Sequence, residues 1–524
     1  MTLEIIPSAP EPARSGPAEI MRDERGGTFR PSLRDAYRAS RFLLVPLFGF
    51  FLLILVAFRA SGALLGDPDT FWHLAVGRHI WQAGAVPQFD EFSYTFEGQP
   101  WMAVEWLAQL NLFGAYSVGG WRGVVLLTAV TVALSYALLF LVLSRKMRLT
   151  IAIGIAATAY IFSMPHFLAR PQIFADPLIV LWAAGLVRAV ESKTTPSALL
   201  WPIITLWANL HGSFTFALAI GAALGAEAFF ASRAGERLRT TRRWTGFLAV
   251  AILCACFTPY GYRPMLYTLQ IFGENDTLPY IQEWQPITLK GVGINEVVTY
   301  GLLFLSLYKG AKIPFWRLIM TIGLLSLAFR HIRFLSLFAF VTPILLATPL
   351  TQQFPFLRLA TQLEQDPQFF RVINECSKKL SYPLSGLIAC GIIAFAAFGP
   401  VASPKADITP AAAVDYIFAQ HLGGRIYNPY DFGGYLIFRG IKTFVDGRTA
   451  HLFLNGFIPH LHDVTVVHPD KFLPYLAELH VSIALVQPDS PEARELANST
   501  EWKKIYADKI AELYKKVTSL PRSI

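Results

Sequence analysis

The sequence predicts an α-helical polytopic membrane protein of about eleven transmembrane helices, with a small C-terminal extracytoplasmic α/β domain. Of its 524 residues, 54% are hydrophobic and only 15% are charged, whereas about a quarter of the residues in a soluble domain are charged. Long apolar runs also alternate with short basic loops, which is typical of a chain that crosses a bilayer repeatedly. Those loops and the basic N-terminal tail account for the net charge of +9, so we expect no nucleic-acid partner.

Residues 1–41 form a basic tail that we expect in the cytoplasm, and residues 42–401 form the predicted transmembrane domain. The first apolar run lacks a small-residue cleavage site, so it should be retained as an anchor. A span needs about twenty apolar residues, and somewhat fewer inside a bundle. On this rule the candidate spans are 42–60, 121–143, 149–164, 173–190, 196–210, 213–231, 244–258, 295–309, 314–329, 334–350 and 383–401.

Basic residues indicate the orientation, because cytoplasmic loops are enriched in Lys and Arg. They follow every second span, at Arg145, Lys146 and Arg148, at Lys193, between Arg233 and Arg243, and at Lys309 and Lys312. This alternation places the N-terminus inside and the C-terminal residues outside. Basic inner loops without eukaryotic sorting signals fit a multi-pass protein of a bacterial inner membrane, with membrane lipids as its immediate partners. The oligomeric state is left open.

The extracytoplasmic loop 62–120 is too long and too polar to be a tight turn. In it, Asp69 or Thr70 can cap a helix that runs from about residue 71 to residue 83. The tryptophans of this helix suit the membrane interface. Residues 104–117 can form a second amphipathic helix.

Residues 402–524 differ from the preceding chain in composition and predict the small extracytoplasmic α/β domain. A final charged helix is expected near 500–517. Short β-like runs occur at Tyr435 to Phe438, Thr443 to Val445 and Val481 to Val486.

The loop 62–120 holds a cluster of titratable residues close to the first span, namely Asp67, Asp69, His73, Asp90 and Glu105. A carboxylate pair can bind a divalent cation such as Mg²⁺ or Mn²⁺, or one carboxylate can act as general base toward a hydroxyl. Asp67 and Asp69 are therefore the catalytic and metal-binding candidates, and the others are candidates for substrate binding. The structural alternative is that Asp69 only caps the helix and Asp67 is a solvated turn residue.

Polar residues also gather at the outer ends of three later spans, on the same predicted side as Asp67. They are Arg170 and Gln172 after the third span, Asn209 and His211 after the fifth, and Arg330, His331 and Arg333 after the ninth. Ionisable groups at membrane depth are costly and usually face a cavity or a partner. Their convergence predicts a polar cavity suited to an anion such as phosphate. Alternatively, the arginines only anchor helix ends by snorkelling.

A third polar feature lies in the C-terminal domain and combines residues 428–435 with Asp446, Gly447 and Arg448. Its glycines permit close backbone approach, and its Asp and Arg side chains could bind a polar ligand or each other. The alternative is that both segments are ordinary hairpin turns.

This layout resembles the GT-C superfamily of polytopic glycosyltransferases. Asp67-Pro68-Asp69 matches, in position and type, the acidic pair that the superfamily carries in its first long extracytoplasmic loop. The resemblance implies hexosyl or pentosyl transfer from a polyprenyl-phosphate donor to a lipid, glycan or protein acceptor, generally with inversion at the anomeric carbon. It also implies that Asp67 or Asp69 deprotonates the acceptor, with or without a divalent cation. The phosphate would be neutralised by Arg170, Arg330 or Arg333, with His73, His211 and His331 as second-choice groups.

A more specific similarity, to a group of bacterial membrane proteins, spans most of the chain. It rests on Asp69 to His73, Arg170 to Gln172 and Gly433 to Leu436, and it implies no particular substrate. The sequence lacks the W-W-D motif of the oligosaccharyltransferases, which argues against transfer to asparagine.

Two other functions fit part of the pattern. A transporter or flippase would use the same charged residues, but such proteins often show an inverted repeat and midplane charges. No repeat is evident in the sequence, and the candidate midplane charges are Asp176 and Glu227. A non-enzymatic envelope assembly factor would bind a partner through its outer domain, and the Asp67 cluster would then be dispensable.

Overall fold

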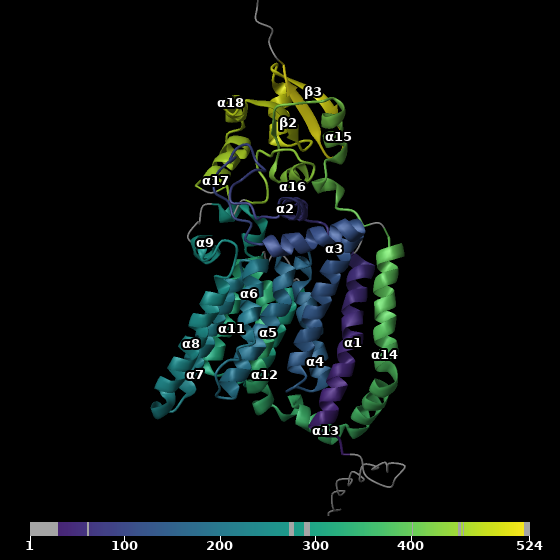
Figure 1. Ribbon diagram of the computed structural model, residues 1–524, viewed down its shortest axis with the longest axis vertical. Helices are drawn as coiled ribbons and strands as arrows, with labels where there is room; N and C mark the ends of the chain where they lie inside the picture. Colours follow the sequence, from purple (N-terminus) through teal and green to yellow (C-terminus); the bar gives the residue numbers. More distant parts are fainter. Residues whose placement is uncertain are drawn as a thin grey trace, which may run out of the picture.

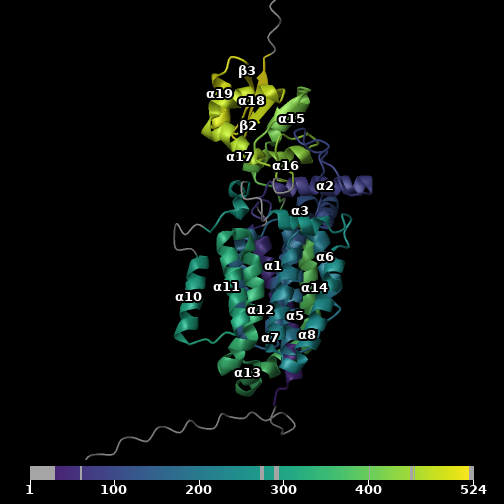
Figure 2. The same ribbon diagram turned by 90° about the vertical axis from the view of Figure 1, so that its left-hand side faces the viewer.

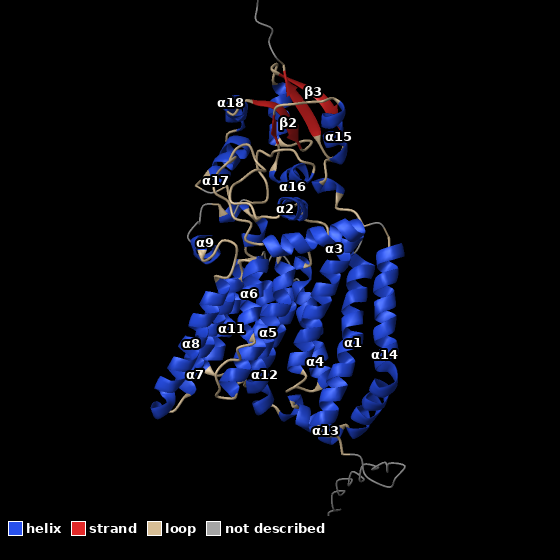
Figure 3. Cartoon of the chain, in the orientation of Figure 1, coloured by secondary structure: helices blue, strands red, loops and turns tan. Residues whose placement is uncertain are grey.

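The computed structural model describes residues 30–59, 62–271, 277–287, 294–400, 402–448, 452–453 and 455–517. Long helices run side by side along the long axis of the molecule, and the strands lie beyond one end of this bundle (Figures 1 and 3). The predicted class is confirmed, because the chain is a helical polytopic membrane protein with a small C-terminal sheet.

The bundle is built from the predicted apolar runs, each of which falls on a helix. These helices are α1 (Leu33–Arg59), α3 (Trp106–Leu143), α4 (Leu149–Ser163), α5 (Gln172–Glu191), α6 (Leu200–Leu210), α7 (Phe214–Ala231), α8 (Arg237–Ala255), α10 (Ile294–Tyr308), α11 (Phe315–Arg330), α12 (Leu335–Gln353) and α14 (Pro367–Phe398). Within the described ranges, 7 helices are long and apolar enough to cross a membrane. The count of about eleven spans stays a prediction. Figure 2 shows α10 standing apart from the other long helices.

Helix α2 (Asp69–Ala83) and the first part of α3 lie across the end of the bundle (Figure 1). Gly120 interrupts α3 with φ 57° and ψ −145°, which lets the chain turn from this crossing segment into the bundle. Most residues of α2 are buried, because the C-terminal helix α16 (Tyr430–Phe438) packs on it. Protein therefore covers most of the surface of α2, and the position of this helix in the membrane interface stays a prediction.

The start of α2 also differs from the expected capping. The helix begins at Asp69, and neither Asp69 nor Thr70 caps it. Instead, Oδ1 of Asp67 accepts a hydrogen bond from the backbone N–H of Asp69 at 2.8 Å, which satisfies one of the free N–H groups at a helix start. The Asp69 carboxylate is thereby left available for other contacts.

The C-terminal unit is a four-stranded sheet of order β1-β2-β4-β3 with helices around it. Strand β1 pairs in parallel with β2, and the other pairs are antiparallel. The strands are β1 (Arg425–Tyr427), β2 (Val481–Val486), β3 (Trp502–Ala507) and β4 (Glu512–Lys516). The remaining α-helices of the chain are α9 (Arg263–Ile271), α13 (Leu359–Gln365), α15 (Ala411–Ala419), α17 (Phe457–His462), α18 (Phe472–Glu478) and α19 (Pro491–Asn498).

The sheet confirms one predicted strand and corrects three other assignments. Strand β2 occupies the expected residues, whereas residues 435–438 belong to helix α16 and residues 443–445 form only an isolated bridge to Ser93. The charged helix expected near 500–517 is the hairpin of β3 and β4. Its turn is set by Asp508, whose carboxylate accepts the backbone N–H groups of residues 510 and 511.

Gly434 is the contact point between α16 and the start of α2. A Cβ at this position would collide with the carbonyl group of Pro68, so Gly434→Ala is expected to lower the free energy of unfolding by about 1–3 kcal/mol. Thermal unfolding of the purified protein measures the loss. Gly423→Ala is the matched control, because nothing lies within 4 Å of a Cβ there. Equal melting temperatures for the two variants would contradict the proposed packing.

Candidate active site

A cavity of about 580 Å³ lies where the bundle meets the C-terminal unit. We call it the central cavity. Its walls come from the start of α2, the residues before α5 and α12, the segment 280–284 and the start of α16. It brings together most of the residues that the sequence predicted for the site. Its charged and polar lining residues are Asp67, Asp69, His73, Glu105, His166, Arg170, Gln172, His211, Tyr280, Glu283, Arg333, Lys405, Tyr430 and Asp431.

Arg170 binds three carboxylates in the cavity wall. Its Nε lies 2.7 Å from Oδ2 of Asp67, and its Nη2 lies 2.5 Å from Oδ2 of Asp69. Its Nη1 contacts Glu283. Burial disfavours the charged form of Arg170, but Asp67 and Asp69 outweigh this effect and raise the pKa of its guanidinium. Arg170 is therefore a fixed cation that orients the two aspartates.

The two aspartates differ in what their oxygens do. Asp67 uses Oδ1 for the backbone of Asp69 and Oδ2 for Arg170. Asp69 gives Oδ2 to Arg170, whereas its Oδ1 lies against Gly447. Burial raises the pKa of Asp69 to about 7, with Arg170 lowering it and Asp67 raising it further. Asp69 can therefore accept and release a proton near neutral pH.

Glu105 is a second carboxylate of the cavity, partly buried, and it faces two histidines. Nε2 of His211 lies 3.3 Å from its Oε1, and Nε2 of His73 lies 3.9 Å from its Oε2. Burial raises the pKa of Glu105 to about 7, against the lowering effect of Arg333 and Arg170. Glu105 can therefore accept and release a proton in the same pH range as Asp69.

Arg333 lies where the central cavity meets a smaller pocket of about 110 Å³. We call this pocket the apolar annex. It continues between α5, α7 and α12, and its apolar lining includes Ile179, Phe216, Ile271, Phe334 and Leu337. The guanidinium of Arg333 lies over the ring of Trp284, 4.5 Å from its centroid. A cation at the mouth of an apolar pocket suits an amphiphile with an anionic head.

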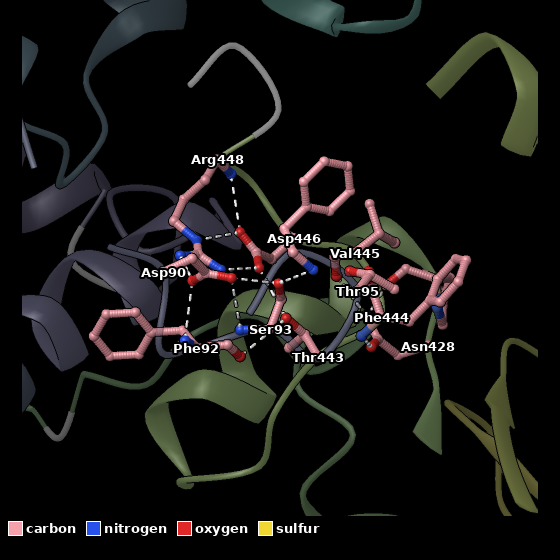
Figure 4. Close-up of polar contacts among 12 residues, drawn as sticks. Asp90, Phe92, Ser93, Thr95, Asn428, Thr443, Phe444, Val445, Asp446 and Arg448 are labelled. Carbon is pink, nitrogen blue, oxygen red and sulfur yellow. Dashed lines mark hydrogen bonds and ion pairs between the residues drawn. The ribbon is translucent and has the colours of Figure 1, made fainter. Parts of the chain in front are cut away.

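Three of the predicted catalytic and substrate-binding residues do not line the central cavity, and neither does Asn209, whose Oδ1 accepts a hydrogen bond from Nε1 of Trp106. Asp90 is fully buried beside Arg448 (Figure 4), so its carboxylate is already paired. Arg330 is exposed at the last residue of α11. His331 contacts a lining residue from outside the cavity. Its Nδ1 lies 2.7 Å from the backbone oxygen of Trp284. Because the chain leaves the helix at this point, successive side chains point in different directions and only Arg333 reaches the cavity.

Six charged or polar residues of the cavity were not predicted as site residues, namely His166, Tyr280, Glu283, Lys405, Tyr430 and Asp431. Glu283 lies in the outer loop after the seventh predicted span, where the orientation rule alone could have found it. Tyr430 and Asp431 belong to the segment 428–435 that the sequence singled out, and Lys405 precedes it by some twenty residues. Burial raises the pKa of Asp431. The C-terminal unit thus supplies one wall of the cavity.

The carboxylates do not fit a divalent cation as they are placed. The guanidinium of Arg170 bridges Asp67 and Asp69, so it fills the position that a shared metal ion would take. Within the described part of the chain, no three His, Cys, Asp or Glu side chains are grouped so that they could hold a metal ion.

Comparison with known proteins identifies the fold. The chain matches no protein-family model and no curated protein. The oligosaccharyltransferase of Archaeoglobus fulgidus in the apo form superposes with a TM-score of 0.52 and 13% identity, over 84% of this chain and 69% of that one. ArnT from Cupriavidus metallidurans superposes with TM-scores of 0.46, bound to undecaprenyl phosphate, and 0.47, in the apo state. Both ArnT structures are 13% identical over 91% of this chain, and the matches cover 98% and 97% of ArnT. The likeness to the oligosaccharyltransferase confirms the predicted GT-C fold.

Proposed function

We propose that this protein is a membrane glycosyltransferase that moves a sugar from a polyprenyl-phosphate donor to a hydroxyl of a lipid, glycan or protein. The reaction would take place on the extracytoplasmic face of a bacterial inner membrane, with the N-terminus in the cytoplasm. One observation carries the proposal: a carboxylate that titrates near neutral pH shares one cavity with a cation placed over an apolar annex.

The donor site follows from Arg333 and the apolar annex. The annex lies between bundle helices and its volume of about 110 Å³ suits the apolar group nearest the phosphate, while the phosphate stays beside Arg333. Charge builds up on the bridging phosphate oxygen as the sugar leaves, and a fixed cation stabilises this charge. We assign the phosphate to Arg333 because the nitrogens of Arg170 are engaged by Asp67, Asp69 and Glu283.

Asp69 is assigned as the general base. The acceptor oxygen attacks the anomeric carbon, the bond from that carbon to the phosphate oxygen breaks, and polyprenyl phosphate leaves. The hydroxyl proton passes to the Asp69 carboxylate, whose pKa of about 7 suits this transfer. Direct displacement inverts the anomeric configuration. Arg170 and Asp67 position the Asp69 carboxylate. Glu105, paired with His211, is the second candidate for acid–base catalysis.

The acceptor is assigned to the wall formed by the C-terminal unit. Lys405, Tyr430 and Asp431 belong to the C-terminal unit, line the central cavity and offer hydrogen-bond donors and acceptors for a polar molecule. The oligosaccharyltransferase with this fold is, by its name, a sugar-transferring enzyme. This supports sugar transfer in general.

The proposal is tested with purified protein in detergent. Polyprenyl phosphates that carry radiolabelled hexoses or pentoses are incubated with a lipid and glycan extract of a bacterial envelope. A glycosyltransferase moves the label onto a new acceptor. A transporter or an assembly factor leaves the donor intact, because detergent provides no second compartment and neither forms a glycosidic bond. Unchanged donor in all mixtures would overturn the proposal.

The pH dependence of the rate tests the choice of base. Asp69 must be ionised to accept a proton, and burial places its pKa at about 7. We therefore expect kcat/KM to rise as the pH increases through about 7 and to level off above it. Measuring initial rates across this range gives the midpoint. A rate that falls through this interval would contradict the assignment, as would a profile that keeps its rise in Asp69→Asn.

A further inference from the structure

The deepest ion cluster outside the central cavity joins Asp90, Asp446 and Arg448, and we call it the buried triad (Figure 4). All three side chains are fully buried. Two nitrogens of Arg448 donate hydrogen bonds to Asp446. Nε lies 2.7 Å from Oδ1, and Nη2 lies 2.7 Å from Oδ2. Its Nη1 lies 2.5 Å from Oδ1 of Asp90. Burying three charges is costly, so this complete pairing indicates that the geometry is needed.

The triad links two segments that lie far apart in sequence. Asp90 belongs to the loop after the first bundle helix, and Asp446 and Arg448 belong to the C-terminal unit. Around the triad, the backbone N–H of Thr443 donates to the oxygen of Phe92 at 3.0 Å, and the N–H of Tyr94 donates to the oxygen of Thr443 at 3.0 Å. The two segments therefore form one rigid unit at this point.

Aromatic rings close the remaining sides of Arg448. Its guanidinium lies 4.9 Å from the ring centroid of Trp101 and 5.4 Å from that of Phe92. Lysine could supply the positive charge at this position. It lacks the planar guanidinium that binds both carboxylates and fits between the two aromatic rings. The side chain is thus specified by shape as well as by charge.

Gly447 connects the triad to the central cavity. It lies between Asp446 and Arg448 in sequence, it lines the cavity, and its backbone lies against Asp69. A Cβ on Gly447 would collide with Oδ1 of Asp69. The placement of this turn therefore decides where the Asp69 carboxylate can lie and how far water can reach it.

We propose that the turn Asp446-Gly447-Arg448 is a positioning element of the active site, in which the buried triad holds Gly447 against the carboxylate of Asp69. Arg448 acts through Gly447 and touches no substrate, so it is a positioning residue. The C-terminal unit is then part of the catalytic machinery and not only a binding module. This inference rests on the proposed function, in which Asp69 is the base.

Gly447→Ala tests the inference, with Gly423→Ala as the matched control in the same unit, since a Cβ at Gly423 meets nothing within 4 Å. The added methyl group pushes the Asp69 carboxylate out of place, so kcat should fall about tenfold or more. The KM for the donor should change little, because Arg333 and the apolar annex are untouched. The midpoint of the pH profile should also shift away from the wild-type value, because the methyl group displaces Asp69 and Trp72 and changes the contacts that set the pKa of Asp69. Gly423→Ala should retain wild-type values.

A second readout does not need turnover. The infrared band of protonated Asp69, assigned as the band lost in Asp69→Asn, is titrated in wild type and in Gly447→Ala. The inference predicts a shifted midpoint in the variant, and equal midpoints together with equal kcat would overturn it. If wild type transfers no sugar, the proposed function fails, while this titration still decides whether Gly447 controls Asp69.

Arg448→Lys provides a further test in case Gly447→Ala does not fold. Lysine keeps the positive charge between Asp90 and Asp446 but loses the fork. We expect a folded protein whose kcat is lowered about tenfold or more and whose pH midpoint is also shifted from the wild-type value. A purely structural role would instead lower the melting temperature and leave the kcat and pH profile of the folded fraction unchanged. That result would overturn the inference.

Discussion

Replacing Asp69 by asparagine is expected to lower the rate of sugar transfer by about 10²- to 10⁴-fold, the usual contribution of a general base. Asparagine has nearly the same shape as aspartate, but its amide cannot take up the proton of the acceptor hydroxyl. Arg170 retains its contacts with Asp67 and Glu283, so the cavity should stay intact. The measurement is initial rate at saturating donor, together with thermal unfolding to show that the variant is folded.

Two carboxylate-to-amide controls sharpen this prediction. Asp67→Asn should cost less activity than Asp69→Asn, because both Asp67 oxygens already serve the backbone of Asp69 and Arg170. Glu97→Gln, at an exposed side chain paired with Lys442, should have no effect. If Asp69→Asn retains the wild-type rate, Asp69 is not the base. A large loss of activity in Glu105→Gln would then assign the role of general base to Glu105.

Replacing Arg333 by glutamine is expected to lower kcat/KM for the donor by about 10- to 150-fold. This range corresponds to the roughly 1.5–3 kcal/mol that a hydrogen bond to a charged group contributes. Arg333 stands between the central cavity and the apolar annex, where the phosphate of an amphiphilic donor would lie. Rates over a range of donor concentrations separate binding from turnover.

The neighbouring arginine supplies the control. Arg330→Gln removes the same charge only three residues away, but Arg330 is exposed and does not line the central cavity. It should therefore leave kcat/KM close to the wild-type value. Equal losses of kcat/KM in Arg333→Gln and Arg330→Gln would show that donor use depends on net positive charge and not on the position of Arg333. A lower kcat/KM in Arg330→Gln alone would contradict the assignment of the donor phosphate to Arg333.

The sequence was sufficient to predict the helical class and most of the cavity. Hydropathy locates apolar runs, and the alternation of basic loops places their ends on one side or the other of the membrane. Residues as distant as Asp69, Arg170 and Arg333 could therefore be assigned to one face from the amino-acid sequence alone. Their convergence in one cavity follows from the fact that all of them lie at the same end of the bundle.

The parts that could not be predicted depend on contacts between distant segments. Asp90 was expected in the site because it lies in the same loop as Asp69, but its partner Arg448 is more than three hundred residues away. The glycines at 433 and 434 suggested a turn, yet they lie in α16, where Gly434 allows close packing on Pro68. Local sequence patterns contain no information about such partners.

The most direct test of the central claim follows both products of one reaction. Purified wild type is supplied with one labelled polyprenyl-phosphate sugar and one acceptor, and the release of polyprenyl phosphate is measured against the glycosylated acceptor. This mechanism predicts one mole of each product per mole of donor, inversion at the anomeric carbon, and formation of both products about 10²- to 10⁴-fold more slowly by Asp69→Asn. Donor breakdown without a new glycosidic bond, or equal transfer by wild type and Asp69→Asn, would contradict it.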